Sequence, residues 1–243
     1  MGKKTSAIVL SAGSGKRMNS EIPKQYLPLD GRPVIYYSLK AFEESTVSEI
    51  VLVCSKDDIE YCRKEIVEKY HLTKVHRIVE GGAERYDSVF CGLKALEDTD
   101  YVLIHDGARP MLTVDMIERS LESVEKDPAV VLAVPAKDTI KVSDENGYAI
   151  QTPDRNTLWN VQTPQTFTYR LIYDAYQKLI SDIAAHSDVP AITDDAMVAE
   201  YATDKKVRLI QGDYMNIKIT TPEDLAVAEV FLEKIKKTVD NVD

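Results

Sequence analysis

The residues of this chain that could carry out chemistry first appear in a loop near the N-terminus. Residues 11–25, SAGSGKRMNSEIPKQ, contain two glycines, the adjacent cations Lys16 and Arg17, and a third cation, Lys24, after a proline. Glycines in a loop between a strand and a helix leave backbone N–H groups exposed, and these groups can surround phosphate oxygens. The loop therefore indicates a site for a phosphorylated ligand.

Two common phosphate-binding motifs do not fit this loop. The dinucleotide motif G-x-G-x-x-G requires a glycine where Met18 stands, and the P-loop requires a serine or threonine where Arg17 stands. Taken alone, the loop could equally be a strand-to-helix turn with a solvated lysine and arginine.

A second group of chemically capable residues follows the apolar run that ends at Asp106. A carboxylate at the end of a strand can bind Mg²⁺ or a substrate hydroxyl, and the nearby Arg109 guanidinium suits a phosphate. The alternative is a structural ion pair that shapes the turn before Pro110. We expect His105 to be a hydrogen-bonded structural residue and not an acid or base.

These residues are connected by short apolar runs that alternate with amphipathic stretches. Apolar runs of this kind predict strands buried on both faces, and apolar residues at three- and four-residue spacing predict helices between them. Strands are expected at 5–11, 49–55, 74–80, 100–106 and 129–135, and helices at 34–45, 57–70, 83–98 and 114–127. The alternation predicts an α/β, Rossmann-like, doubly wound and mostly parallel sheet.

Ligands of such sheets bind at the carboxyl ends of the strands. We therefore expect the segments 11–24, 81–88 and 106–110 to face one crevice. Residues 137–155 interrupt the alternation, because two β-like stretches flank Asn146 and Gly147, a pair that suits a tight hairpin turn. A β-hairpin arm projecting from the sheet is expected there.

The C-terminal part of the chain predicts helices at about 168–180 and 194–202, a strand at 206–211, and a last helix. Thr221 before Pro222, with Asp224 three residues on, is typical of a helix start. Asp194 and Asp195 are interpreted as a helix cap and its solvated neighbour. We expect residues 1–243 to form a single domain with the arm at about 137–155.

Composition limits the function classes. With 44% hydrophobic residues and a net charge of −10, the chain suits an ordinary globular protein and not one whose whole surface binds nucleic acid. Three cysteines without a C-x-x-C pair suit a reducing compartment. No apolar run approaches the roughly 20 residues of a membrane-spanning helix. We expect a soluble, cytoplasmic protein.

Several further motifs carry a resemblance to a known family. The stretch from Ala12 through PKQYLPLDGRPVIYYSL resembles nucleotidyltransferases that attach nucleoside monophosphates to sugar or alditol phosphates. The chain resembles the 2-C-methyl-D-erythritol 4-phosphate cytidylyltransferase family more closely. It contains sequence blocks of that family, in the same order, over nearly its whole length. These blocks are GGAERYDSV (81–89), HDGARP (105–110), KDTIK (137–141), DRNTLWNVQTPQTF (154–167), TDDA (193–196) and NIKITTPEDL (216–225).

The resemblance implies transfer of CMP from CTP to methylerythritol phosphate with release of pyrophosphate, a step of non-mevalonate isoprenoid synthesis. The nucleophile would already be an anionic phosphate oxygen, so no general base is needed. Such a site must align the phosphates and supply positive charge to the transition state, which lysines, arginines and Mg²⁺ can do.

Family position also implies a role for individual residues. Catalytic roles fall on Arg17, Lys24 and Lys218; nucleotide binding falls on Ala12, Gly13, Ser14, Gly15, Lys16, Gly82, Ser88 and Asp106; and binding of the second substrate falls on Arg109, Thr139, Arg155 and Thr193. Asp106 is also the candidate Mg²⁺ ligand. Alone, each cation would be read as a surface charge, and Gly81-Gly82 as a plain tight turn.

The resemblance further implies a homodimer in which the arm crosses to the other subunit and completes its methylerythritol phosphate pocket. Ser11 and Lys16 depart from the residues most frequent in the family, but neither change removes a charge or a backbone donor. Two alternatives remain: a ribitol-5-phosphate cytidylyltransferase, which shares the loop and the PKQ, TPQ and NIK motifs, and a nucleotide-sensing module without activity. The DRNTLW and TDDA motifs favour the methylerythritol family over the ribitol enzyme.

Overall fold

A seven-stranded sheet forms the centre of the molecule in the computed structural model, which describes residues 2–13 and 22–240, with side chains described up to residue 235. The strand order is β11-β7-β10-β6-β1-β4-β5. The strands are β1 (Thr5–Ser11), β4 (Glu49–Cys54), β5 (Val75–Glu80), β6 (Tyr101–Asp106), β7 (Ala129–Pro135), β10 (Trp159–Thr168) and β11 (Arg208–Gln211). The predicted α/β class and the mostly parallel, doubly wound sheet are confirmed.

One strand of the sheet runs against the others. The pairs of β1 with β4 and β6, of β4 with β5, and of β7 with β11 are parallel, whereas β10 pairs antiparallel with both β6 and β7. Its register with β7 shifts between Val161 and Gln165. Strand β10 has no counterpart among the strands expected from the sequence, so it is an addition to the expected topology.

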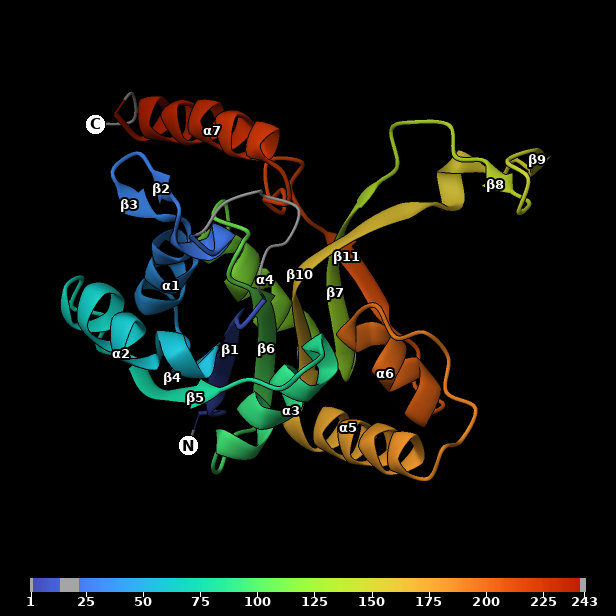
Figure 1. Ribbon diagram of the computed structural model, residues 1–243, viewed down its shortest axis with the longest axis horizontal. Coiled ribbons are helices and arrows are strands. Elements are labelled where there is room, and N and C mark those ends of the chain that lie inside the picture. Colours follow the sequence, from blue (N-terminus) through green and yellow to red (C-terminus); the bar gives the residue numbers. More distant parts are fainter. Residues whose placement is uncertain (1, 14–21, 241–243) are drawn as a thin grey trace.

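Helices cover both faces of the sheet (Figure 1). One hydrophobic cluster joins the strands to α1 (Val34–Glu44), α4 (Val114–Val124) and the short α2 (Ile59–Tyr61), which continues as a π-helix over Cys62–Glu68. A second cluster joins the other face to α3 (Arg85–Ala95), α5 (Tyr169–Ala184) and α6 (Asp195–Ala202). Strands buried on both faces explain why the sequence of β4, β6 and β7 is almost entirely apolar.

A smaller third cluster lies above the carboxyl ends of the strands. It joins α7 (Pro222–Asp240) to the two-residue strand β2 (Pro28–Leu29), which pairs with β3 (Arg32–Pro33). Figure 1 shows α7 across the top of the molecule. Among the residues that the structure describes, no helix is long and apolar enough to cross a membrane.

The segment 137–155 extends away from the sheet beyond the ends of β7 and β10 (Figure 1). Within it, β8 (Val142–Ser143) pairs antiparallel with β9 (Ala149–Gln151). Gly147 in the intervening turn has a φ of +84°, a conformation that glycine adopts without strain. Tyr148 and Ile150 are 73% and 66% exposed, so the tip of this segment presents apolar side chains to its surroundings.

Candidate functional site

Two adjoining pockets lie where the carboxyl ends of β1 and β6 meet the loops that follow β1, β5 and β6 and the middle of β10. The first has a volume of about 230 Å³ and is lined by Leu10, Ser11, Ala12, Gly13, Lys24, Gln25, Gly82, Ala83, Glu84, Arg85, Ser88, Asp106, Ala108 and Lys218. The second, of about 220 Å³, is lined by Arg85, Asp106, Arg109, Val161, Gln162, Thr163, Gln165, Thr193, Asp194 and Lys218. The two pockets share Arg85, Asp106 and Lys218.

The start of the glycine loop is held from the segment that follows it. Gln25 Nε2 donates to the backbone oxygens of Ser11, at 2.6 Å, and Gly13, at 3.3 Å. The Ser11 hydroxyl donates to the Tyr26 hydroxyl at 3.0 Å. Ala12 and Gly13 therefore line the first pocket with fixed backbone. The predicted site residues Ser14, Gly15, Lys16 and Arg17 lie outside the described residues.

The loop between β5 and α3 approaches the same pocket closely. A Cβ at Gly81 would lie 2.7 Å from both the Ala12 Cβ and the Ser88 Oγ, and a Cβ at Gly82 would lie 2.2 Å from the Asp87 Cβ. The Gly82 N–H donates to Ser88 Oγ at 3.1 Å, and a capping box formed by Glu84 and Asp87 begins α3. These glycines serve close packing of the pocket wall, which a plain surface turn would not require.

Asp106, the last residue of β6, is the charged centre of both pockets. Its Oδ1 lies 3.3 Å from Arg85 Nε, and its Oδ2 accepts a hydrogen bond of 2.7 Å from Lys218 Nζ. Burial alone would raise the pKa of this carboxyl, but Arg85, Lys218 and Arg109 outweigh that effect and lower it well below its usual range. Asp106 is therefore ionised, and its carboxylate lines both pockets.

Arg109 lies on the second pocket, and backbone oxygens hold its guanidinium. Its terminal nitrogens donate to the oxygens of Asn216, at 2.8 Å, and Val161, at 3.4 Å. Its Nε is buried without a hydrogen-bond partner, and burial lowers the pKa of the guanidinium. Arg109 makes no ion pair with Asp106 at hydrogen-bonding distance, so the structural pair considered from the sequence is instead formed by Arg85.

His105 is a structural residue, as expected. Its ring nitrogens lie 3.3 Å from the Arg109 oxygen and 3.0 Å from the Thr163 hydroxyl, and the side chain is fully buried. Burial lowers the pKa of His105 to about 3, so the ring is neutral at physiological pH.

The two predicted catalytic lysines reach the first pocket from distant parts of the chain. Lys24 begins a short 3₁₀ turn, and its Nζ donates to the Ile219 oxygen at 2.8 Å. Lys218 precedes Ile219, whose N–H donates to the Ala108 oxygen at 2.9 Å. The backbone next to Lys218 is thus attached to the loop after β6, and both lysines line the first pocket.

Arg85 and Asp195 are site residues that the sequence analysis missed. Both terminal nitrogens of Arg85 donate to the Asp195 carboxylate at 2.8 Å, and Tyr176 donates its hydroxyl to the same carboxylate at 2.5 Å. The expectation of a solvated Asp195 is wrong, because the residue is fully buried. Asp194 is the predicted cap: its Oδ1 accepts from the Met197 N–H. The only signal for Arg85 was its place in the GGAERYDSV motif.

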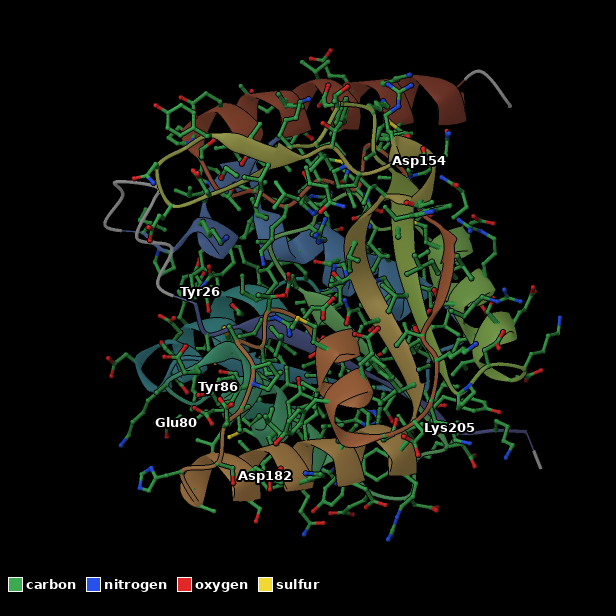
Figure 2. The ribbon with its side chains drawn as sticks, turned by 90° about the vertical axis from the view of Figure 1, so that its right-hand side faces the viewer. Tyr26, Glu80, Tyr86, Asp154, Asp182 and Lys205 are labelled. Atoms are coloured by element: carbon green, nitrogen blue, oxygen red, sulfur yellow. The ribbon has the colours of Figure 1, made fainter. Side chains whose placement is uncertain are left out.

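The remaining predicted substrate residues divide into two groups. Thr193 lines the second pocket. Thr139 and Arg155 are exposed, line neither pocket, and lie in the projecting segment, where Arg155 donates to the Lys137 oxygen at 3.1 Å. Asp154, beside Arg155, lies at the same end of the molecule as α7, far from Asp182 and Lys205 toward the other end (Figure 2). This chain alone does not bring Thr139 and Arg155 to the pockets.

The donor set around Asp106 decides what kind of metal the site could accept. Among the residues that the structure describes, no three His, Cys, Asp or Glu side chains are grouped to hold a metal ion. Mg²⁺ that arrives with substrate phosphates needs only one or two protein carboxylates. A carboxylate offers about four lone-pair positions, of which Arg85 and Lys218 occupy two. Asp106 therefore fits a metal that is bound mainly through the phosphates of a ligand, and not one held by the protein alone.

Comparison with known proteins gives a consistent result over almost the whole chain. Residues 5–234 match the family model described as 2-C-methyl-D-erythritol 4-phosphate cytidylyltransferase. A relative of that name from Lachnospira eligens is 53% identical over 228 residues, covering 93% of this chain and 98% of the relative. Another from Lachnoclostridium phytofermentans is 48% identical and covers 96% of this chain and 97% of the relative.

Solved structures agree in fold. The crystal structure of 4-diphosphocytidyl-2C-methyl-D-erythritol synthase from Anaerococcus prevotii matches with a TM-score of 0.82 and 38% identity, over 95% of this chain and 99% of that one. The crystal structure of 2-C-methyl-D-erythritol 4-phosphate cytidylyltransferase from Thermus thermophilus matches with a TM-score of 0.73 and 27% identity, over 93% and 98%.

Proposed function

The chain belongs to the 2-C-methyl-D-erythritol 4-phosphate cytidylyltransferase family, and we propose that its two adjoining pockets bind CTP and methylerythritol phosphate for transfer of CMP with release of pyrophosphate. The observation that carries this assignment of the pockets is their shared wall. Arg85, Asp106 and Lys218 line both, so a phosphate bound in one pocket meets a phosphate bound in the other at these side chains.

The first pocket is proposed to hold CTP. Gly82 and Ser88 line this pocket together with Ala12 and Gly13. Closely packed backbone of this kind suits recognition of a flat base by polar backbone groups. A pocket that hydrogen-bonds cytosine rejects other bases because buried polar groups would be left without partners. The loop residues Ser14 to Lys16 are proposed to bind the triphosphate, as their family positions imply.

The lysines are proposed to act on the transferring phosphate. The attacking oxygen of methylerythritol phosphate is already anionic, so the reaction needs alignment and charge compensation in place of a general base. Lys24 and Lys218 place two ammonium groups on the first pocket, and Arg17 is proposed to add a third cation. A lysine ammonium is a compact charge well suited to a phosphoryl oxygen that gains charge in the transition state.

The second pocket is proposed to hold methylerythritol phosphate through Arg109 and Thr193. Arg109 offers a guanidinium with a buried, unpartnered Nε, and a planar fork of donors suits a phosphate. Asp106, at the junction, is proposed to accept a hydrogen bond from a substrate hydroxyl.

A homodimer is proposed to complete this second pocket. An isolated two-stranded hairpin is marginally stable in water, yet β8 and β9 project with Tyr148 and Ile150 exposed. A second copy of the chain would cover these side chains. Thr139 and Arg155 of the arm are then proposed to contact the substrate phosphate of the neighbouring subunit.

Mg²⁺ is proposed as the cofactor, with Asp106 as the residue that would hold it beside the triphosphate. When bound, it supplies positive charge that neutralises the phosphates.

The three free cysteines of the chain, two of them buried, support a location in the reducing cytoplasm.

The test is a turnover assay that measures pyrophosphate release from CTP with methylerythritol phosphate or ribitol 5-phosphate, with Mg²⁺ or with excess chelator. We expect turnover with methylerythritol phosphate that stops in chelator and returns with Mg²⁺. A higher kcat/KM for ribitol 5-phosphate would establish the alternative substrate. No turnover with either alcohol would indicate a nucleotide-sensing module.

A further inference from the structure

A chain of charged groups, which ends in a tyrosine hydroxyl, lies behind the junction of the two pockets. Tyr176, fully buried on α5, donates its hydroxyl to Asp195 at 2.5 Å. Asp195, at the start of α6, has no exposed surface and accepts both terminal nitrogens of Arg85 at 2.8 Å. Arg85 in turn reaches Asp106 through its Nε at 3.3 Å. The helix layer below the sheet is thereby connected to the carboxylate at the pocket junction.

The two cations on Asp106 are held in different ways. Arg85 is fixed by a bidentate ion pair with a second buried carboxylate, that of Asp195. In this geometry a planar guanidinium loses the least conformational entropy for each hydrogen bond that it forms. Lys218 has a side chain that is 37% exposed and reaches Asp106 through a single ammonium on a flexible stem. Of the two, Lys218 is the cation that can leave Asp106 for a phosphate in the adjoining pocket.

A departure of Lys218 is possible only if Asp106 keeps a cationic partner. The Asp106 side chain is 11% exposed, and a buried charge that loses its partner is strongly destabilised. Arg85 meets this requirement as long as it stays in place, and its orientation depends on Asp195 and Tyr176.

From this arrangement we propose that Asp195 and Tyr176 are positioning residues that hold Arg85 against Asp106, so that Lys218 is released to the reacting phosphate. The inference rests on the proposed cytidylyltransferase activity and on the role of Lys218 in it. If Arg85 is loosened, Lys218 remains as the partner of Asp106, and the transition state loses its ammonium. The effect should fall on kcat and much less on KM.

The first variant is Asp195→Asn, which keeps the size of the side chain and removes the charge that fixes Arg85. We expect kcat to fall by about tenfold or more, with the KM values for CTP and methylerythritol phosphate within about threefold of wild type. Tyr176→Phe removes one donor to Asp195 and should lower kcat by about three- to tenfold.

A matched control lies on the same helix. The Tyr169 hydroxyl donates to the Leu93 oxygen at 3.1 Å and has no part in the chain of charges. Tyr169→Phe should leave kcat unchanged. If Asp195→Asn fails to fold, the comparison of Tyr176→Phe with Tyr169→Phe decides the proposal alone, and an equal effect of the two overturns it.

A double-mutant cycle separates positioning from general damage to the fold. In a Lys218→Ala background, measured by single turnover and corrected for folded protein, Tyr176→Phe and Asp195→Asn should each lower the rate by less than about twofold, because their action passes through Lys218. If each variant lowered the rate by the same factor in the wild-type and Lys218→Ala backgrounds, the proposal would be overturned. An inactive wild-type protein would instead contradict the proposed function, so the two failures are distinguishable.

Discussion

At the scale of the residue, the site is a small set of opposite charges brought together at one junction. Lys24 and Lys218 reach the first pocket from positions 194 residues apart in the chain, and each ammonium is oriented by a defined acceptor, the Ile219 oxygen or Asp106. Because these acceptors are part of the protein, both ammonium groups are held at the pocket before a substrate arrives, and Lys218 has only to move from Asp106 to a phosphate in the same pocket. Such preorganised charge is the main way in which a phosphoryl-transfer site lowers its barrier.

Replacement of either lysine should therefore act mainly on the chemical step. We expect Lys24→Ala and Lys218→Ala each to lower kcat by about 10²-fold or more, because the lost charge interacts most strongly with the transition state. Steady-state kinetics of pyrophosphate release measure this. Lys64→Ala, which breaks an exposed pair with Glu60, is the control and should have wild-type kinetics. Wild-type kcat with a raised KM in both active-site variants would disprove the catalytic roles.

At the scale of the element, the β5–α3 loop packs closely against Ala12, at the start of the glycine loop. An alanine at Gly81 would push against Ala12 and Ser88, and both of these residues line the first pocket. Extra atoms in a well-packed site typically cost about 1–3 kcal/mol of free energy. We therefore expect Gly81→Ala to weaken CTP binding and to raise the KM for CTP by roughly tenfold. The KM for methylerythritol phosphate should change little.

A second glycine provides the complementary control. An alanine at Gly212 would meet the side chain of Gln162, which lines the second pocket. Gly212→Ala should therefore affect methylerythritol phosphate and spare CTP. If both variants raised both KM values equally, the separation of the two pockets would be contradicted. Initial-rate measurements with each substrate varied in turn give the comparison.

Most elements of this fold could be predicted from the sequence because each has a local signal. The run at 5–11 matches β1, and 49–55 extends one residue beyond β4, since parallel strands buried on both faces are nearly continuous apolar segments. β10 has no such signal. It contains Pro164, which argues against a central strand, and its buried polar side chains bond to segments far away, as Gln165 does to Asp194.

The candidate site divides in the same way. The lysines and Asp106 stand in recognisable motifs, so the sequence identified them, and the structure places them on the two pockets. The pair of Arg85 with Asp195 joins positions 110 residues apart. Nothing local distinguishes such an aspartate from a solvated neighbour of a helix cap, because its burial is decided by how α5 and α6 pack on the sheet.

At the scale of the whole molecule, the proposed homodimer predicts complementation between two damaged chains. An Arg155→Ala chain and a Lys24→Ala chain should each be nearly inactive. If arms cross, one site of the mixed dimer carries both lesions and the other carries neither, so activity should recover toward half per mixed dimer. Native mass spectrometry confirms the exchange of subunits. Exchange without recovery would show that each site is built from one chain.

Acid stability is a second property of the whole molecule. His105 is neutral in the folded protein because burial lowers its pKa to about 3, whereas the unfolded chain binds a proton near the ordinary value of 6.5. Between these values the unfolded state holds more protons, so the free energy of unfolding should fall by about 1.4 kcal/mol for each pH unit below about 6.5. Stability above pH 6.5 is not affected by this group.

Denaturant unfolding between pH 7 and pH 4.5 measures this dependence. A His105→Gln variant should be less stable at pH 7, because its contacts to Arg109 and Thr163 change, but should lose less stability on acidification. An identical pH slope in the variant and the wild type would show that other groups cause the acid sensitivity.

The position of β10 in the sheet also sets an order of assembly during synthesis. Its neighbours β6 and β7 are not paired with each other, so β7 has no sheet partner until β10 has been made. In contrast, β6, β1, β4 and β5 form a contiguous block within the first 106 residues. During synthesis from the N-terminus, the four strands of this block can pair with one another before β7 has a partner. Pulse-labelled hydrogen exchange on refolding should protect amides of β1 before those of β7, and simultaneous protection would mean that the sheet assembles in a single event.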